Sequence, residues 1–175
     1  MSHKELNYLP YSRQQITEED IASVVSVLKS EFLTQGPILP KFEKKISNFL
    51  NVNFTLAVTN ATSALHLACL ALGLKKGDVV WTSPNTFVAS ANCARYCGAD
   101  IDFVDIDINT GLMDMNELSK KLEIANLKNK LPKIIIPVHF AGSSCDMKAL
   151  YRLSRKYHFS IIEDASHALG GSYED

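Results

Sequence analysis

Residues 133–164 read KIIIPVHFAGSSCDMKALYRLSRKYHFSIIED and contain three successive structural patterns. The run at 133–138 is rich in β-branched residues, which is typical of a buried strand. Residues 147–157 repeat apolar side chains at helical spacing, and residues 159–163 form a second apolar run. A strand, a helix and another strand make a βαβ unit, whose two strands lie parallel in one sheet.

The same alternation extends from this unit toward the N-terminus. An early helix begins near Thr17, which can cap it, because Asp20 lies three residues further on. Residues 1–15 have the pattern of an extended arm. The alternation predicts an α/β fold, a three-layer sandwich around a mostly parallel sheet. We expect further strands at residues 54–59, 79–82 and 101–104, and further helices at residues 40–50, 62–72, 87–97 and 116–124.

Composition narrows the class of protein. The chain has 175 residues, of which 46% are hydrophobic and 21% charged, as in a folded globular domain. The formal charge of −1 argues against non-specific binding to nucleic acid or to an anionic membrane. The first ten residues lack an apolar secretory core, and no apolar run reaches roughly 18 residues, so we expect neither a signal peptide nor a membrane span.

The cysteines favour a reducing compartment. Cys69, Cys93, Cys97 and Cys145 form no C-x-x-C pair, and Cys93 and Cys97 lie four apart, on one face of a predicted helix. That spacing differs from a zinc knuckle. We expect buried free thiols, no metal site and a cytoplasmic protein.

In parallel α/β sheets, ligands bind beyond the carboxyl ends of the strands, so the residues there are the candidate site. Small residues, Ala61, Thr62 and Ser63, open the helix that follows the first strand. The unpaired N–H groups and the dipole of a helix N-terminus can hold a phosphate. The alternative is that Asn60 or Thr62 only caps the helix.

Side chains at three other strand ends are able to bind a ligand or take part in catalysis. Phe87 either stacks on a flat ligand ring or enters the core at the start of the next helix. Asp164 needs a partner at the end of a buried strand, and a protonated pyridine nitrogen is one that would keep the ring an electron sink. The alternative is an aspartate that caps the following turn. His139 is either a ligand or base, or a polar residue at a strand end.

Residues 105–111, DIDINTG, begin like a calcium loop. Thr110 and Asn116 occupy the sixth and twelfth positions, where such a loop requires Gly and Glu. We therefore expect a turn held by Asx-type hydrogen bonds.

Four motifs, in this order, resemble those of one enzyme family. They are LTQGP (33–37), NATSAL (60–65), SPNTFVA (83–89) and EDASHALG (163–170). Together they are similar to the DegT/DnrJ/EryC1/StrS sugar aminotransferases, which are pyridoxal-phosphate enzymes of fold type I, and the similarity covers nearly the whole chain. The NATSAL and SHALG forms are most similar to the transaminases of pseudaminic acid synthesis.

The resemblance implies a reaction and a set of roles. The enzyme would place an amino group on C4 of a UDP-linked 4-keto-6-deoxy-N-acetyl sugar, with glutamate as donor, on the way to a surface polysaccharide or glycosylated flagellin. It would be a homodimer, and residues 16–175 would be the N-terminal part of its cofactor-binding large domain. The implied cofactor ligands are Ala61, Thr62 and Ser63 for the phosphate of pyridoxal 5′-phosphate, Phe87 for its ring, Asp164 for the ring nitrogen and His167 near the ring oxygen. The implied contacts to the nucleotide sugar are Tyr11, Glu31, Phe32, Leu33 and Thr34.

One residue that the family requires is missing from these motifs. In the family, the lysine that forms the Schiff base lies a short way downstream of the motif holding Asp164 and His167, and here no lysine follows Lys156. We therefore expect the Schiff-base lysine beyond Asp175, the last of the 175 residues. The same reasoning predicts a large domain that is incomplete at its C-terminus and no catalytic residue in the chain. The chain alone should show no turnover and at most weak cofactor binding.

Other functions compete with this one. A sugar 3-aminotransferase or a dehydratase of the same fold would carry nearly the same motifs. A truncated, non-catalytic product that dimerises or binds a nucleotide sugar is the alternative from a different class. A nucleotide-binding protein unrelated to pyridoxal phosphate would need a Gly-rich phosphate loop, and none is present.

Overall fold

The computed structural model describes residues 13–174. The chain divides into two compact units, one ending at Ala57 and the other beginning at Val58. Among the described residues, no helix combines the length and apolar character needed to cross a bilayer. Each unit is described separately below.

The first unit contains the helices α1 (Glu18–Leu28) and α2 (Ile38–Leu50). The predicted start of α1 is confirmed: Thr17 is the N-cap, and its backbone N–H donates to Asp20 at 2.8 Å in a capping box. The strand expected at residues 54–59 is absent. A strand needs a neighbouring strand to accept its backbone N–H groups. Here the Ala57 N–H donates to the Glu43 side chain instead, at 2.9 Å.

The second unit holds a parallel sheet in the order β2-β1-β3-β4. Pro137 has no N–H to donate, and regular β3 pairing ends before it. Val138 and Asp164 then form an isolated bridge, which places Asp164 beside the end of β3. β3 and β4 are consequently shorter than predicted. The strands are β1 (Val79–Thr82), β2 (Asp100–Phe103), β3 (Ile134–Ile136) and β4 (Ser160–Ile161).

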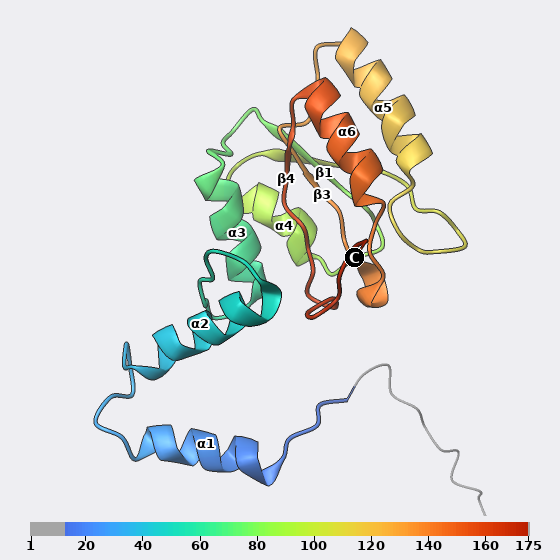
Figure 1. Cartoon of the computed structure of the whole chain (residues 1–175). Helices are drawn as coiled ribbons and strands as arrows, with labels where there is room; N and C mark the ends of the chain where they lie inside the picture. The colour runs from blue at the N-terminus through green and yellow to red at the C-terminus, as the bar shows by residue number, and fades with distance from the viewer. Residues whose placement is uncertain (1–12, 175) are drawn as a thin grey trace, which may run out of the picture. The chain divides into compact units, whose positions relative to one another are not determined.

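Helices cover both faces of this sheet, so the predicted three layers are present (Figure 1). On one face, Val80 and Ile134 pack with Leu65 of α3 and Cys93 of α4. On the other face, Trp81, Ile135 and neighbouring residues pack against α5 and α6. Successive side chains of a strand point to opposite faces of the sheet, so alternate residues pack into two separate cores. The helices are α3 (Ala61–Ala71), α4 (Ala89–Tyr96), α5 (Met115–Leu127) and α6 (Met147–Tyr157), with a short 3-10 helix η1 (Phe140–Gly142) after β3.

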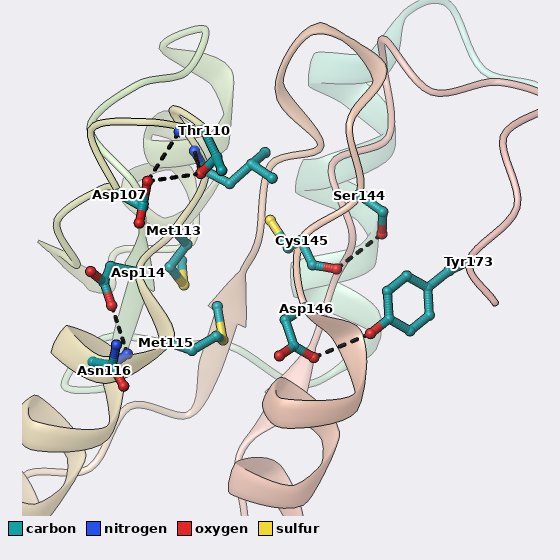
Figure 2. A pocket seen from close by; sticks show the side chains of 11 residues that line it. Asp107, Thr110, Met113, Asp114, Met115, Asn116, Ser144, Cys145, Asp146 and Tyr173 are labelled. Atoms are coloured by element: carbon teal, nitrogen blue, oxygen red, sulfur yellow. Dashed lines mark hydrogen bonds between the residues drawn. The ribbon is translucent and has the colours of Figure 1, made fainter.

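The loop after β2 forms the turn that the sequence predicts. Asp107 Oδ1 accepts the backbone N–H of Asn109 at 2.7 Å and that of Thr110 at 3.0 Å, and Figure 2 shows Asp107 and Thr110 at one side of a shallow pocket. These backbone hydrogen bonds, that of Asn109 foremost, lower the pKa of Asp107. Among residues 13–174, no group of three or more His, Cys, Asp or Glu side chains is placed to hold a metal ion.

Candidate active site

A cavity of about 500 Å³ lies at the carboxyl ends of β1, β3 and β4. Thr86 and Phe87 reach it from the segment after β1, His139 from the end of β3, and Asp164 from the segment after β4. The start of α3 forms another wall. The cavity brings together five of the six residues predicted to bind the cofactor: Ala61, Thr62, Phe87, Asp164 and His167. These residues are as much as about a hundred positions apart in the sequence, and the topology of the sheet brings them together.

The start of α3 offers backbone donors to this cavity. Asn60 is the N-cap, and its Oδ1 accepts the Ser63 N–H at 2.9 Å, so the capping interpretation of Asn60 is correct. The N–H groups of Ala61 and Thr62 have no acceptor among the described residues. Ser63 does not line the cavity. The cap therefore leaves two N–H groups and the positive end of the helix dipole available to an anion.

Asp164 is the buried acid of the cavity, with 7% of its surface exposed. Its Oδ2 accepts the Ser90 hydroxyl at 2.6 Å, and its Oδ1 accepts both the hydroxyl and the N–H of Ser166, at 2.7 and 3.3 Å. Asp164 does cap the following turn through Ser166, and it also faces the cavity. These three donors hold the carboxyl group in one orientation.

Phe87 lies outside the core, contrary to the alternative in which it begins the next helix. α4 begins two residues later, at Ala89, and Phe87 is 73% exposed while lining the cavity. Two other residues of the cavity lining form a ring pair: the His167 ring lies 6.3 Å from that of Phe140 in a tilted arrangement. The exposed ring of Phe87 is thus available to a flat ligand.

His139 is a hydrogen-bonded wall residue. Its Nδ1 accepts the Cys145 N–H at 3.2 Å and its Nε2 lies 2.9 Å from Glu163 Oε2. Because Nδ1 is an acceptor, the proton of the neutral ring sits on Nε2 and points to Glu163. The hydrogen bond from His139 lowers the pKa of Glu163. Both ring nitrogens are therefore occupied within the protein.

The residues predicted to contact the sugar belong to the first unit, or lie outside the described residues. Glu31, Phe32, Leu33 and Thr34 form the exposed connection between α1 and α2 in the first unit. Phe32 and Leu33 expose 56% and 65% of their surfaces, and their contact with the sugar stays a prediction. Tyr11 lies outside the described residues.

Comparison with known proteins assigns the family. The profile of the DegT/DnrJ/EryC1/StrS aminotransferase family matches residues 14–175. The chain belongs to this family. As a DegT-family chain, it has the fold expected from its motifs, and its structural neighbours are aminotransferases of fold type I.

Individual relatives of this DegT-family chain are sugar transaminases. It is 41% identical over 167 residues to the UDP-4-amino-4,6-dideoxy-N-acetyl-beta-L-altrosamine transaminase of Campylobacter jejuni, an alignment covering 95% of this chain and 43% of the relative. It superposes on Helicobacter pylori PseC, described as an aminotransferase of pseudaminic acid biosynthesis, with a TM-score of 0.85 and 34% identity, covering 95% of this chain and 43% of that one. The PLP form of the sugar aminotransferase Spr1654 of Streptococcus pneumoniae gives a TM-score of 0.80 and 30% identity, covering 93% and 44%. The chain thus spans less than half the length of these relatives.

The cofactor of the family, pyridoxal 5′-phosphate, fits the residues present. Two unpaired N–H groups at the start of α3 suit its phosphate, and the oriented Asp164 carboxyl suits its ring nitrogen. The cavity volume lies in the range of small-molecule sites. When bound, the cofactor supplies an electron sink for amino-group chemistry.

The Schiff-base lysine is the part of the family's site that this cavity does not contain. No lysine among residues 13–174 lines the cavity. Asp175, beyond which the sequence predicts that lysine, lies outside the described residues. The position of the lysine therefore stays a prediction.

Proposed function

We propose that this chain forms the N-terminal part of the cofactor-binding large domain of a transaminase that places an amino group on C4 of a UDP-linked 4-keto-6-deoxy-N-acetyl sugar. The Campylobacter and Helicobacter relatives named above support this substrate class. Glutamate is the proposed donor. Four free cysteines are consistent with the proposed cytoplasmic location.

The single observation that carries the proposal is the cavity that unites the start of α3, Phe87, Asp164 and His167. Each wall matches one part of a pyridoxal phosphate: N–H donors for the phosphate, an exposed ring for stacking and an oriented acid for the pyridine nitrogen. The family's covalent step needs an amine, and the cavity has no lysine among the described residues. We therefore expect the 175 residues alone to bind the cofactor at most weakly and without turnover. In a complete, homodimeric enzyme we expect Glu31–Thr34 to serve sugar binding.

Binding of pyridoxamine 5′-phosphate tests the proposal, because this form of the cofactor binds without a covalent link to lysine. Calorimetry of the purified protein should show saturable binding at one site, and Asp164→Ala should weaken it. Ser154→Ala is the matched control, since Ser154 is a buried serine on α6 whose hydroxyl donates to the Tyr151 carbonyl. An unmodified affinity in Asp164→Ala would refute the assignment of this cavity. Sustained transamination by the 175 residues alone would refute the expected lack of turnover.

A further inference from the structure

Ser90 is a buried hydroxyl that the proposed function leaves without a role. It lies on α4, has no exposed surface, and donates to Asp164 Oδ2 at 2.6 Å across 74 residues of sequence. Ser90 is the second residue of α4, and the Phe87 carbonyl lies at a longer 3.3 Å from the same hydroxyl. The short bond to Asp164 is therefore the principal one.

Thr86 extends this bond into a directed chain. Thr86 Oγ1 and Ser90 Oγ lie 2.7 Å apart. A hydroxyl has one proton, and that of Ser90 goes to the carboxylate, which has none to give. Thr86 therefore donates to Ser90, and Ser90 donates to Asp164. This direction locks the Ser90 rotamer toward the acid.

The two carboxylate oxygens of Asp164 differ in the number of hydrogen-bond donors that they accept. Oδ1 accepts two donors, both from Ser166, whereas Oδ2 accepts only the Ser90 hydroxyl. Each carboxylate oxygen has about two acceptor positions. Among the described residues, Oδ2 therefore keeps one acceptor position and Oδ1 keeps none.

We propose that Ser90 is a positioning residue that presents Asp164 Oδ2 to the protonated ring nitrogen of the cofactor. The inference rests on the proposed function, because it requires the cofactor ring in this cavity. Ser90 touches neither cofactor nor substrate and acts only through Asp164. Its loss frees the carboxyl group to turn, so only ligands with a ring nitrogen lose affinity.

A pair of ligands separates this role from general support of the fold. Pyridoxamine 5′-phosphate has the ring nitrogen, and its 1-deaza analogue has carbon in that position. Ser90→Ala should weaken binding of pyridoxamine 5′-phosphate roughly tenfold, the size expected for one hydrogen bond to a charged group, and leave binding of the analogue unchanged. Ser90→Thr, which keeps the hydroxyl, should retain most of the difference between the ligands, and Ser154→Ala should retain all of it.

The possible results are distinct. Equal weakening of both ligands in Ser90→Ala would mean that Ser90 only supports the fold, and would overturn the inference. Unchanged binding of both ligands would overturn it as well. If the unsubstituted protein bound neither ligand, or bound both equally, the proposed function of the cavity would fail first. Should Ser90→Ala melt far below the unsubstituted protein, Thr86→Val provides the second test, because it removes the donor to Ser90 and should reduce the same ligand preference.

Discussion

The start of α3 permits a substitution that removes a ligand donor while preserving the helix. Ala61 is the first residue of α3, directly after the N-cap Asn60. Proline is favoured at this position because its missing N–H would have no partner within the helix. Asn60 has φ −168° and ψ 169°, an extended conformation of the kind that a residue before proline adopts, and Ala61 is exposed. Ala61→Pro should therefore fold, with stability unchanged or raised by about 0.4–1 kcal/mol.

The same substitution should impair phosphate binding. It removes the Ala61 N–H from the donors facing the cavity, and a hydrogen bond to a charged group contributes about 1.5–3 kcal/mol. That loss corresponds to a roughly tenfold to hundredfold weaker affinity for pyridoxamine 5′-phosphate. Pyridoxamine without the phosphate should bind equally to both proteins, because it has no group for the missing donor.

Calorimetry with the two ligands and thermal melts of each variant provide the measurement. Glu18→Pro is the matched control, since Glu18 is the first residue of α1 after the N-cap Thr17 and is remote in sequence from the cavity residues. It should leave both affinities unchanged. Undiminished affinity of Ala61→Pro for the phosphate form, with an intact melt, would refute the reasoning that the α3 N-terminus holds the phosphate.

Burial and charge support three further predictions. Phe87→Ala should change stability by less than about 0.5 kcal/mol, because the ring is exposed, yet weaken cofactor binding in the same calorimetric assay. Leu118→Ala removes a fully buried side chain from the core beneath α5 and should cost about 2–5 kcal/mol in chemical denaturation. Glu163 has a folded-state pKa below its ordinary 4.5, owing to its hydrogen bond with His139. Its contribution to stability is present above that ordinary value and is lost as the pH falls through the lowered one, so Glu163→Gln should flatten the acid-denaturation curve in that window.

Most helices and strands of the second unit could be predicted from hydrophobic period, because most of them contribute apolar residues to one of the two cores. The ends of β3 and β4 could not be placed as well, since the ladder stops at Pro137 while the apolar run continues to Val138. The strand predicted at residues 54–59 was wrong for a related reason. An apolar run indicates a potential strand, but it does not supply the neighbouring strand that completes the hydrogen bonds.

Part of the candidate site could be predicted from the sequence, because its residues follow the ends of strands, where parallel sheets bind ligands. Ser90 gave no such signal. It is a small residue within a helix whose significance depends on a partner 74 positions away, and no local pattern reports that distance. The proximity of Ser90 to Asp164 follows from the order of the strands in the sheet, which the local sequence does not specify.

The segment between β1 and α4 links the two contacts that a pyridine ring would make. The Phe87 carbonyl accepts the Ser90 N–H at 3.2 Å, so the stacking residue and the residue that orients Asp164 are joined through the backbone at the first turn of α4. Because the helix begins only at Ala89, Phe87 stays outside the core while Ser90 is buried in it. A one-residue change of register in α4 would rotate the position now held by Ser90 by about 100° around the helix axis, away from Asp164. The fixed spacing of Phe87 and Ser90 at the start of α4 therefore couples the proposed ring stacking to the proposed orientation of Asp164.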